Sequence, residues 1–87
     1  MRHRATPRFW ACYDALPTVT RQSADRCFAL LRKDLRHPSL HFKKVGRFWS
    51  VRVGLYHRAL AVESGADLTW VWIGSHAEYD RLTETSK

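Results

Sequence analysis

The 87-residue sequence lacks the long apolar run that a membrane span requires. No stretch approaches the roughly 20 apolar residues needed to cross a bilayer. The opening MRHRATPRF has no apolar core of a secretory signal, and His3 is expected in a loose N-terminus. Repeats, low-complexity tracts and linkers are also missing. We therefore expect no membrane partner, a cytoplasmic location, and one domain over residues 1–87 with an ordered core at about residues 6–82.

The spacing of ligands that a structural metal requires is missing as well. Cys12 and Cys27 form no Cys-x-x-Cys pair, and the five histidines are scattered along the chain. No run of carboxylates suggests a magnesium site. We expect no metal and no cofactor, and we interpret the two cysteines as buried thiols, with a disulfide or metal role as the alternatives.

Acidic residues are missing between Leu40 and Val62, although the chain as a whole contains eight. The 15 Lys and Arg residues give a formal net charge of +7. A surface meant for solubility alone mixes charges of both signs, whereas a purely basic stretch favours a polyanion, usually nucleic acid. The basic residues of this segment that we take as candidate nucleic-acid contacts are Lys43, Lys44, Arg47 and Arg52.

Two helical patterns fill the first part of the chain. Thr6 is a candidate N-cap and Pro7 suits the first helical position. Apolar residues then recur at helical spacing until Pro17 interrupts them. Thr18 is expected to cap a second helix that runs to about Leu35. The short Leu-Pro turn between the two patterns predicts an antiparallel helical hairpin.

From Ser39 onward the apolar pattern changes from helical to alternating. Four runs, SLHFKKV, RFWSVRV, LYHRALAV and LTWVWIG, are rich in β-branched and aromatic residues, and glycines separate them. We expect a four-stranded antiparallel sheet with one face on the helices and the other carrying charge. HAEYDRLTETSK predicts a short C-terminal helical turn, and the fold class is α+β.

The expected charged face gathers residues that suit phosphodiester chemistry. Arg52 and Arg58 are expected on it, and Gly74 allows a sharp exit that releases His76 and Tyr79 beside it. Arginine clamps a phosphate and stabilises transition-state charge, histidine moves protons near neutral pH, and tyrosine stacks on a base or bonds a phosphate. RNA carries its own nucleophile, the 2′-hydroxyl, so these residues predict cleavage of RNA without a metal ion.

Each of these residues has a structural alternative. His76 is alternatively the cap of the final helix, and Tyr79 is alternatively a core residue of the C-terminal turn. Arg58 stands between apolar strand residues, where it costs free energy unless an anion accompanies it. Its structural alternative is an ion pair with Glu63 or Asp14.

The order of these elements, together with four motifs, resembles the RelE/ParE superfamily of bacterial type II toxins from about Thr6 to Leu82. The motifs are LP between the two helices, HPSLHFKKVG into the sheet, WSVRVGLYHRAL across the central hairpin, and WIGSHAEYD at the end. The resemblance implies a small α+β toxin held by a cognate antitoxin in a hetero-oligomeric complex. RelE-like members enter the ribosome and cut mRNA, so it also implies an endoribonuclease, or mRNA interferase, that inhibits translation.

The resemblance also implies roles for single residues. Arg58 falls where RelE-like toxins carry the arginine of a Tyr-Arg pair, and Arg52 falls near a catalytic lysine. His76 matches a position that is arginine or histidine, and Tyr79 approximates a terminal aromatic residue. The implied mechanism has Arg58 on the scissile phosphate, His76 as a proton donor, and Lys44 or Arg52 favouring attack by the 2′-hydroxyl.

The chain departs from that pattern in two places. Tyr56-His57-Arg58 replaces the Tyr-Arg pair, and Tyr79 follows His76 more closely than the corresponding tyrosine of RelE would, so a different ring can supply base stacking. A ParE-like member, which inhibits DNA gyrase by binding it, is the alternative within the same fold. A nonenzymatic nucleic-acid-binding domain is the third hypothesis.

Overall fold

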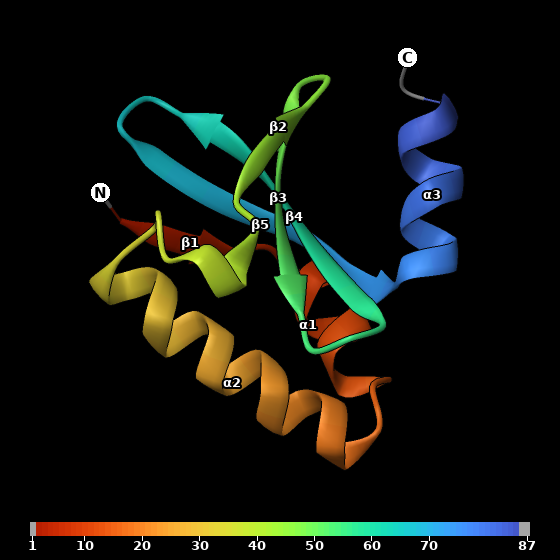
Figure 1. The fold of residues 1–87 in the computed structure, drawn as a ribbon. Coiled ribbons are helices and arrows are strands. Elements are labelled where there is room, and N and C mark those ends of the chain that lie inside the picture. The colour runs from red at the N-terminus through yellow and green to blue at the C-terminus, as the bar shows by residue number, and fades with distance from the viewer. Residues whose placement is uncertain (1, 86–87) are drawn as a thin grey trace.

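A five-stranded sheet with helices on both faces organises the chain in the computed structural model, which describes residues 2–85 (Figure 1). The elements in chain order are β1 (His3–Ala5), α1 (Pro7–Asp14), α2 (Thr18–Lys33), the 3-10 turn η1 (Pro38–Leu40), β2 (Lys43–Val45), β3 (Phe48–Val53), β4 (His57–Ser64), β5 (Asp67–Ser75) and α3 (His76–Thr85). The α+β class and the helical hairpin predicted from the sequence are confirmed.

The sheet has the strand order β1-β5-β4-β3-β2. The predicted antiparallel meander forms β2 to β5, and β1 adds a fifth strand that runs parallel to β5. The expected loose N-terminus is therefore wrong, because His3 pairs with Leu68 and accepts a hydrogen bond from Nε1 of Trp70 at 3.1 Å. Three residues are too few for an alternating pattern to reveal a strand.

The two N-terminal helices cover one face of the sheet, called here the first face. Oγ1 of Thr6 accepts a hydrogen bond from the amide of Phe9, which confirms the predicted cap of α1. Pro17 occupies the cap position of α2 instead of Thr18, and α2 ends at Lys33 because Asp34 has extended backbone angles. The buried residues of this core are Phe9, Ala24, Leu31, Leu40, Val51, Val53, Ala59, Ala61, Leu68, Trp70 and Ile73.

The first predicted strand is much shorter than its sequence pattern. SLHFKKV forms the end of η1 and the three residues of β2, and His41 between them has a left-handed backbone with φ of 47°. That conformation breaks the extended path. β2 is thus a short edge strand that pairs with β3 from Phe48 to Ser50.

The opposite side of the sheet, the second face, carries α3. Leu60, Trp72 and Tyr79 are buried there in a small apolar cluster, with Leu82 half-buried against it. The second face is therefore charged in part only, which corrects the expectation from the strand pattern. The predicted short helical turn is a ten-residue helix, and its apolar residues need this cover.

Gly74 makes room for the side chain of Trp72, two residues earlier on β5, and its backbone is not in the left-handed region. A Cβ at this position would lie 3.0 Å from Cη2 and 3.1 Å from Cε2 of Trp72. The indole ring of Trp72 therefore crosses the space that any other residue would fill. This close approach, and not a sharp exit of the chain, is the reason that a glycine is needed.

Among the described residues, none of the helices has the length and apolar character that a bilayer span demands.

We predict that Gly74→Ala lowers the free energy of unfolding by about 1–3 kcal/mol, because the new methyl group overpacks the indole. Urea denaturation measures this change. In a Trp72→Phe background the benzo atoms that meet the methyl are gone, so the same substitution should cost much less. Equal costs in the two backgrounds would contradict the proposed contact.

Candidate phosphate-binding and proton-transfer site

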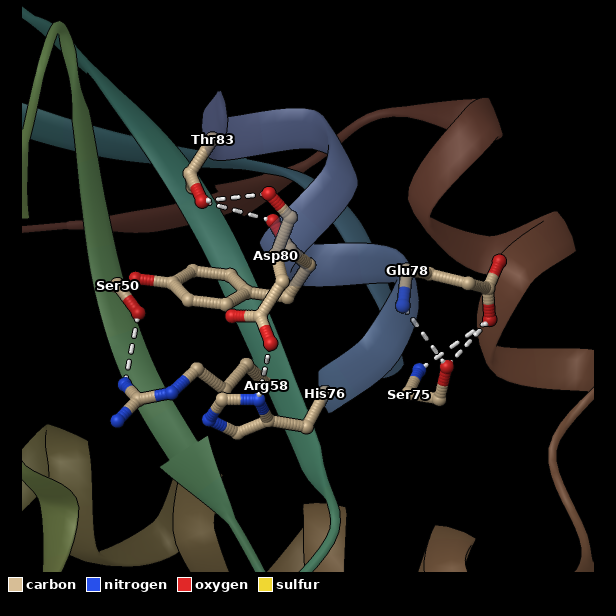
Figure 2. Close-up of polar contacts among 8 residues, drawn as sticks. Ser50, Arg58, Ser75, His76, Glu78, Asp80 and Thr83 are labelled. Carbon is tan, nitrogen blue, oxygen red and sulfur yellow. Dashed lines mark hydrogen bonds and ion pairs between the residues drawn. The ribbon is translucent and has the colours of Figure 1, made fainter. Parts of the chain in front are cut away.

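Arg58 is the buried charge of the second face. It lies on β4 opposite Gly74 and Arg52, and it is 7% exposed. Its Nη1 donates a hydrogen bond of 2.9 Å to Oγ of Ser50 (Figure 2). Its guanidinium carbon lies 5.0 Å from the ring centre of Tyr79. Its buried Nε has no hydrogen-bond partner among the described residues.

Neither acid proposed as a structural partner for Arg58 pairs with it. Glu63 is on the first face, where its carboxylate accepts from Nε1 of Trp49 and lies 3.8 Å from Nζ of Lys44. Asp14 ends α1, and none of the ion pairs found among the described residues joins a carboxylate to Arg58. A buried guanidinium costs free energy unless an anion compensates it. An anionic ligand bound to Arg58 would therefore stabilise its buried charge.

The N-terminus of α3 is capped by Ser75 and not by His76. Oγ of Ser75 accepts from the amide of Glu78 at 3.2 Å, and the carboxylate of Glu78 accepts from the amide and the hydroxyl of Ser75 (Figure 2). This reciprocal pair is a capping box. The side chain of His76 is consequently not used as a cap.

His76 instead forms an exposed pair with an acid. Its Nδ1 lies 3.2 Å from Oδ2 of Asp80, one helical turn later, and both side chains are at least half exposed. A carboxylate at one ring nitrogen orients an imidazole and leaves the other nitrogen for proton transfer. His76 is therefore placed on the surface in a form suited to moving a proton.

Tyr79 connects the two groups. It is 5% exposed, and its ring lies 5.0 Å from the guanidinium of Arg58 and 5.5 Å from the imidazole of His76. The structure thus brings these three residues together, as predicted. Because the Tyr79 ring is buried against Leu60 and Trp72, it holds its neighbours in place and offers no free face to a base.

The remaining basic residues are distributed around β3. Arg52 is opposite Arg58, but its Nε donates to the carbonyl of Gly54 and its Nη1 lies 3.4 Å from Nε2 of His41. Its guanidinium therefore follows the strand edge beyond the end of β2. Lys43 shares the register of Ser50 on the second face. Arg47, in the β2–β3 turn, lies 5.2 Å from the ring of Phe48.

Lys44 does not join this group. It is opposite Trp49 in the β2–β3 pair and lies above the Trp49 ring, with Glu63 nearby. Trp49 packs against the first-face core, so Lys44 is on the other side of the sheet from Arg58. Consecutive strand residues point to opposite faces, which is why Lys43 and Lys44 are separated.

Three residues of the site were not identified from the sequence. The strand alternation places Ser50 on the same face as Arg52, but a hydroxyl alone does not mark it as a partner of Arg58. Asp80 follows His76 by four residues, the spacing that brings side chains together on a helix. Tyr56 is 72% exposed in the β3–β4 turn, and its carbonyl accepts a 2.7 Å hydrogen bond from the amide of His76.

Potential metal ligands are dispersed in the described part of the chain. Among these residues, no three of the His, Cys, Asp and Glu side chains lie together. Cys12 and Cys27 are free, half-buried thiols, and burial raises the pKa of Cys27 to about 11.

The fold is similar to those of several solved toxins. RelE in the RelB–RelE antitoxin–toxin complex from Methanococcus jannaschii matches with a TM-score of 0.71 and 15% identity, over 90% of this chain and 96% of that one. YafQ from Escherichia coli BL21(DE3) gives 0.68 and 12%, over 91% and 98%. The isolated E. coli RelE toxin gives 0.64 and 6%, over 97% of each chain.

These matches confirm the predicted resemblance at the level of the fold. The chain has the fold of the RelE, YafQ and YoeB/ParE toxins across nearly its whole length. No protein-family model and no curated protein sequence matches it.

The capping box gives a prediction that separates the two interpretations of His76. Ser75→Ala should lower the free energy of unfolding by about 0.5–2 kcal/mol, because the first turn of α3 loses its cap. His76→Ala should change it by less than about 0.5 kcal/mol, as expected for an exposed side chain. Urea denaturation of the two variants compares them directly, and a larger cost for His76→Ala would identify that residue as structural.

Proposed function

We propose that this protein is the toxin of a type II toxin–antitoxin system and an endoribonuclease that cuts ribosome-bound mRNA without a metal ion. The observation that carries the proposal is the buried Arg58, whose Nε has no partner among the described residues. His76 is beside it, across the ring of Tyr79. The fold of RelE, seen in complexes with the antitoxin RelB, supports the same function.

In the proposed reaction Arg58 binds the scissile phosphate. Its Nε and free Nη2 hydrogens donate to the two nonbridging oxygens, while Nη1 keeps its bond to Ser50. The 2′-oxygen of the RNA attacks phosphorus and loses its proton to water, and the bond to the 5′-oxygen breaks. The guanidinium stabilises the charge that develops at phosphorus, so this scheme needs no divalent ion.

His76 completes the proton balance. Its Nε2 donates a proton to the leaving 5′-oxygen, while Asp80 holds Nδ1 and stabilises the charged ring before the transfer. Arg52, opposite Arg58 in the strand register, is the basic residue proposed to favour attack by the 2′-hydroxyl, and its guanidinium would leave the carbonyl of Gly54 to do so. Lys44 is no longer proposed for this role, because it lies on the first face. The products are a 2′,3′-cyclic phosphate and a 5′-hydroxyl.

Access to Arg58 is controlled by α3. The helix rests on the sheet through Tyr79 and Leu82, and it leaves Arg58 largely covered. An outward movement of α3 would admit a phosphate to Nε. Tyr79 is thus a positioning residue, and a cognate antitoxin that lays acidic side chains over Lys43, Arg47 and Arg52 would block the same face.

Base stacking is assigned to Tyr56. Its ring is exposed at the tip of the β3–β4 hairpin, and its backbone is bonded to the amide of His76. A base stacked on this ring would place the adjoining phosphate close to His76. Stacking on an aromatic ring is the common way that proteins hold single-stranded RNA bases.

We predict that His76→Ala and Arg58→Ala fold but lose cleavage of mRNA on translating ribosomes. Loss of a general acid costs about 10²–10⁴-fold in rate. His76→Ala should slow the chemical step with little change in binding, whereas Arg58→Ala should weaken binding as well. His57→Ala is the matched control, since its side chain shares the first face with Val53 and Ala59.

End-group analysis and a chelator test the same reaction. The fragments should carry a 2′,3′-cyclic or 3′-phosphate, and EDTA should leave the rate of purified protein unchanged once ribosomes are kept intact by a compensating polyamine. If ribosome-bound mRNA stays intact and DNA gyrase supercoiling is blocked instead, the ParE-like function is correct. Binding of RNA without either effect would leave the nonenzymatic hypothesis.

Tyr56 gives an independent prediction. Removing one stacked base costs about 1–3 kcal/mol by alanine substitution, so Tyr56→Ala should weaken binding of single-stranded RNA by roughly 5- to 150-fold. Tyr56→Phe keeps the ring and should bind like the parent protein. Leu55→Ala, the exposed neighbour in the same turn, is the control. Equal binding by Tyr56→Ala and the parent protein would remove this residue from the site.

A further inference from the structure

A second group of basic residues lies far from α3. Arg2 and Arg4 flank His3 at β1, and Arg32 is in the last turn of α2, one turn after Phe28. These five residues line one concavity of about 600 Å³, and all three arginines are exposed. β1 and the C-terminal end of α2 lie at the left of Figure 1, and α3 lies at the right.

The charge of this concavity is strongly positive. Asp67 is the acid beside it: its carboxylate lies 3.6 Å from Nε of Arg4 and accepts from the backbone amide of Arg2 at 3.2 Å. This carboxylate pairs with the guanidinium of Arg4 only, and three guanidinium groups line the concavity. The C-terminal end of a helix favours cations, which stabilises Arg32 there without neutralising it.

His3 supplies a donor of fixed orientation among these charges. Nε1 of Trp70 donates to Nδ1 of His3, and the two rings are stacked with their centres 6.1 Å apart. Because Nδ1 accepts, the proton of the neutral imidazole is on Nε2. Burial lowers the pKa of His3, and nearby positive charges, including Arg32, lower it further. The neutral form of the ring is therefore favoured, and its Nε2–H is the one donor that it can offer a ligand.

We propose that the concavity formed by Arg2, His3, Arg4 and Arg32 is a second phosphate-binding site that holds the backbone of RNA outside the cleavage site. The imidazole of His3 packs edge to face against the ring of Phe28. Together with the guanidinium groups, its N–H supplies hydrogen-bond donors for the oxygens of a phosphodiester. The site adjoins the first residues of β5, whereas His76 follows its last residue. Seven residues of extended strand separate the two by roughly 23 Å.

This inference does not depend on the proposed cleavage. A chain that binds RNA and leaves it intact would use the same contacts, and a ribonuclease would use them to hold RNA at a distance from the scissile bond. RNA is favoured over an acidic protein because exposed arginines and a neutral hydrogen-bond donor surround the one aromatic side chain of Phe28 in the concavity. An acidic protein surface is the competing occupant that the experiment must separate.

The first test follows the His3 imidazole by NMR during pH titration of the full chain. A bound phosphate favours the charged ring, so both inorganic phosphate and a single-stranded 2′-O-methyl oligonucleotide should raise the pKa of His3. The 2′-O-methyl group prevents cleavage during the measurement. A response to inorganic phosphate without a response to the oligonucleotide would identify a site for free phosphate and overturn the assignment to RNA.

The second test uses the salt dependence of oligonucleotide binding. Each single-strand phosphate contact contributes a slope of about −0.7 to log K against log salt. The double variant Arg2→Ala/Arg32→Ala should therefore have a slope shallower by about 1.4. The control, Arg8→Ala/Arg26→Ala, removes two exposed charges of the helices and should keep the slope within about 0.3 of the parent value.

Two outcomes would overturn the proposal. Equal slopes for both double variants would mean that the concavity is not a phosphate contact. A polyglutamate peptide that shifts the His3 signals, while phosphate and oligonucleotide leave them unmoved, would make it a protein-docking surface. Circular dichroism of each variant confirms that the comparison is made between folded proteins, and Arg32→Gln, which keeps the side-chain stem, repeats the slope measurement if the double variant is unfolded.

Discussion

A guanidinium without a carboxylate, buried where apolar side chains surround it, determines the arrangement of the second face. Arg58 is held by one hydrogen bond that it donates to Ser50 and by the ring of Tyr79. Those two contacts do not replace the hydration that burial removes. The helix α3 covers this charge through Tyr79. It is itself attached to the sheet through a small cluster of apolar residues. A bound phosphate would repay the cost that the fold leaves uncompensated.

The alternation of side chains along β4 keeps the charge of Arg58 uncompensated. Glu63 is on β4, five residues after Arg58, so the pleat places it on the first face with Lys44 and Trp49. The sheet therefore separates the acid and the base on opposite sides of a layer of backbone, and the acid stabilises the edge strand instead.

The sequence predicted the elements better than their contacts. Thr6, Pro7 and the alternating runs gave the helical hairpin and four strands, because those signals are local. β1 was missed because its three residues gain stability from Trp70 and Leu68, which are distant in sequence. The cap at Ser75 and the packing of the Trp72 ring against Gly74 depend on side-chain geometry. The sequence therefore placed His76 and Tyr79 close together, but it did not show that His76 pairs with an acid on the surface while Tyr79 is buried.

The pairing of β1 with β5 also determines the order in which the protein can be completed. His3 and Trp70 are 67 positions apart, so β1 can pair only after β5, the last strand of the sheet, has been made. Closing so long a loop is slow relative to local helix and hairpin formation. During synthesis the helical hairpin and the meander can form on an unfinished sheet, and the surface formed by Arg2, Arg4 and Arg32 is assembled last. The edge strand β1 therefore joins the sheet only after β5 is available to pair with it.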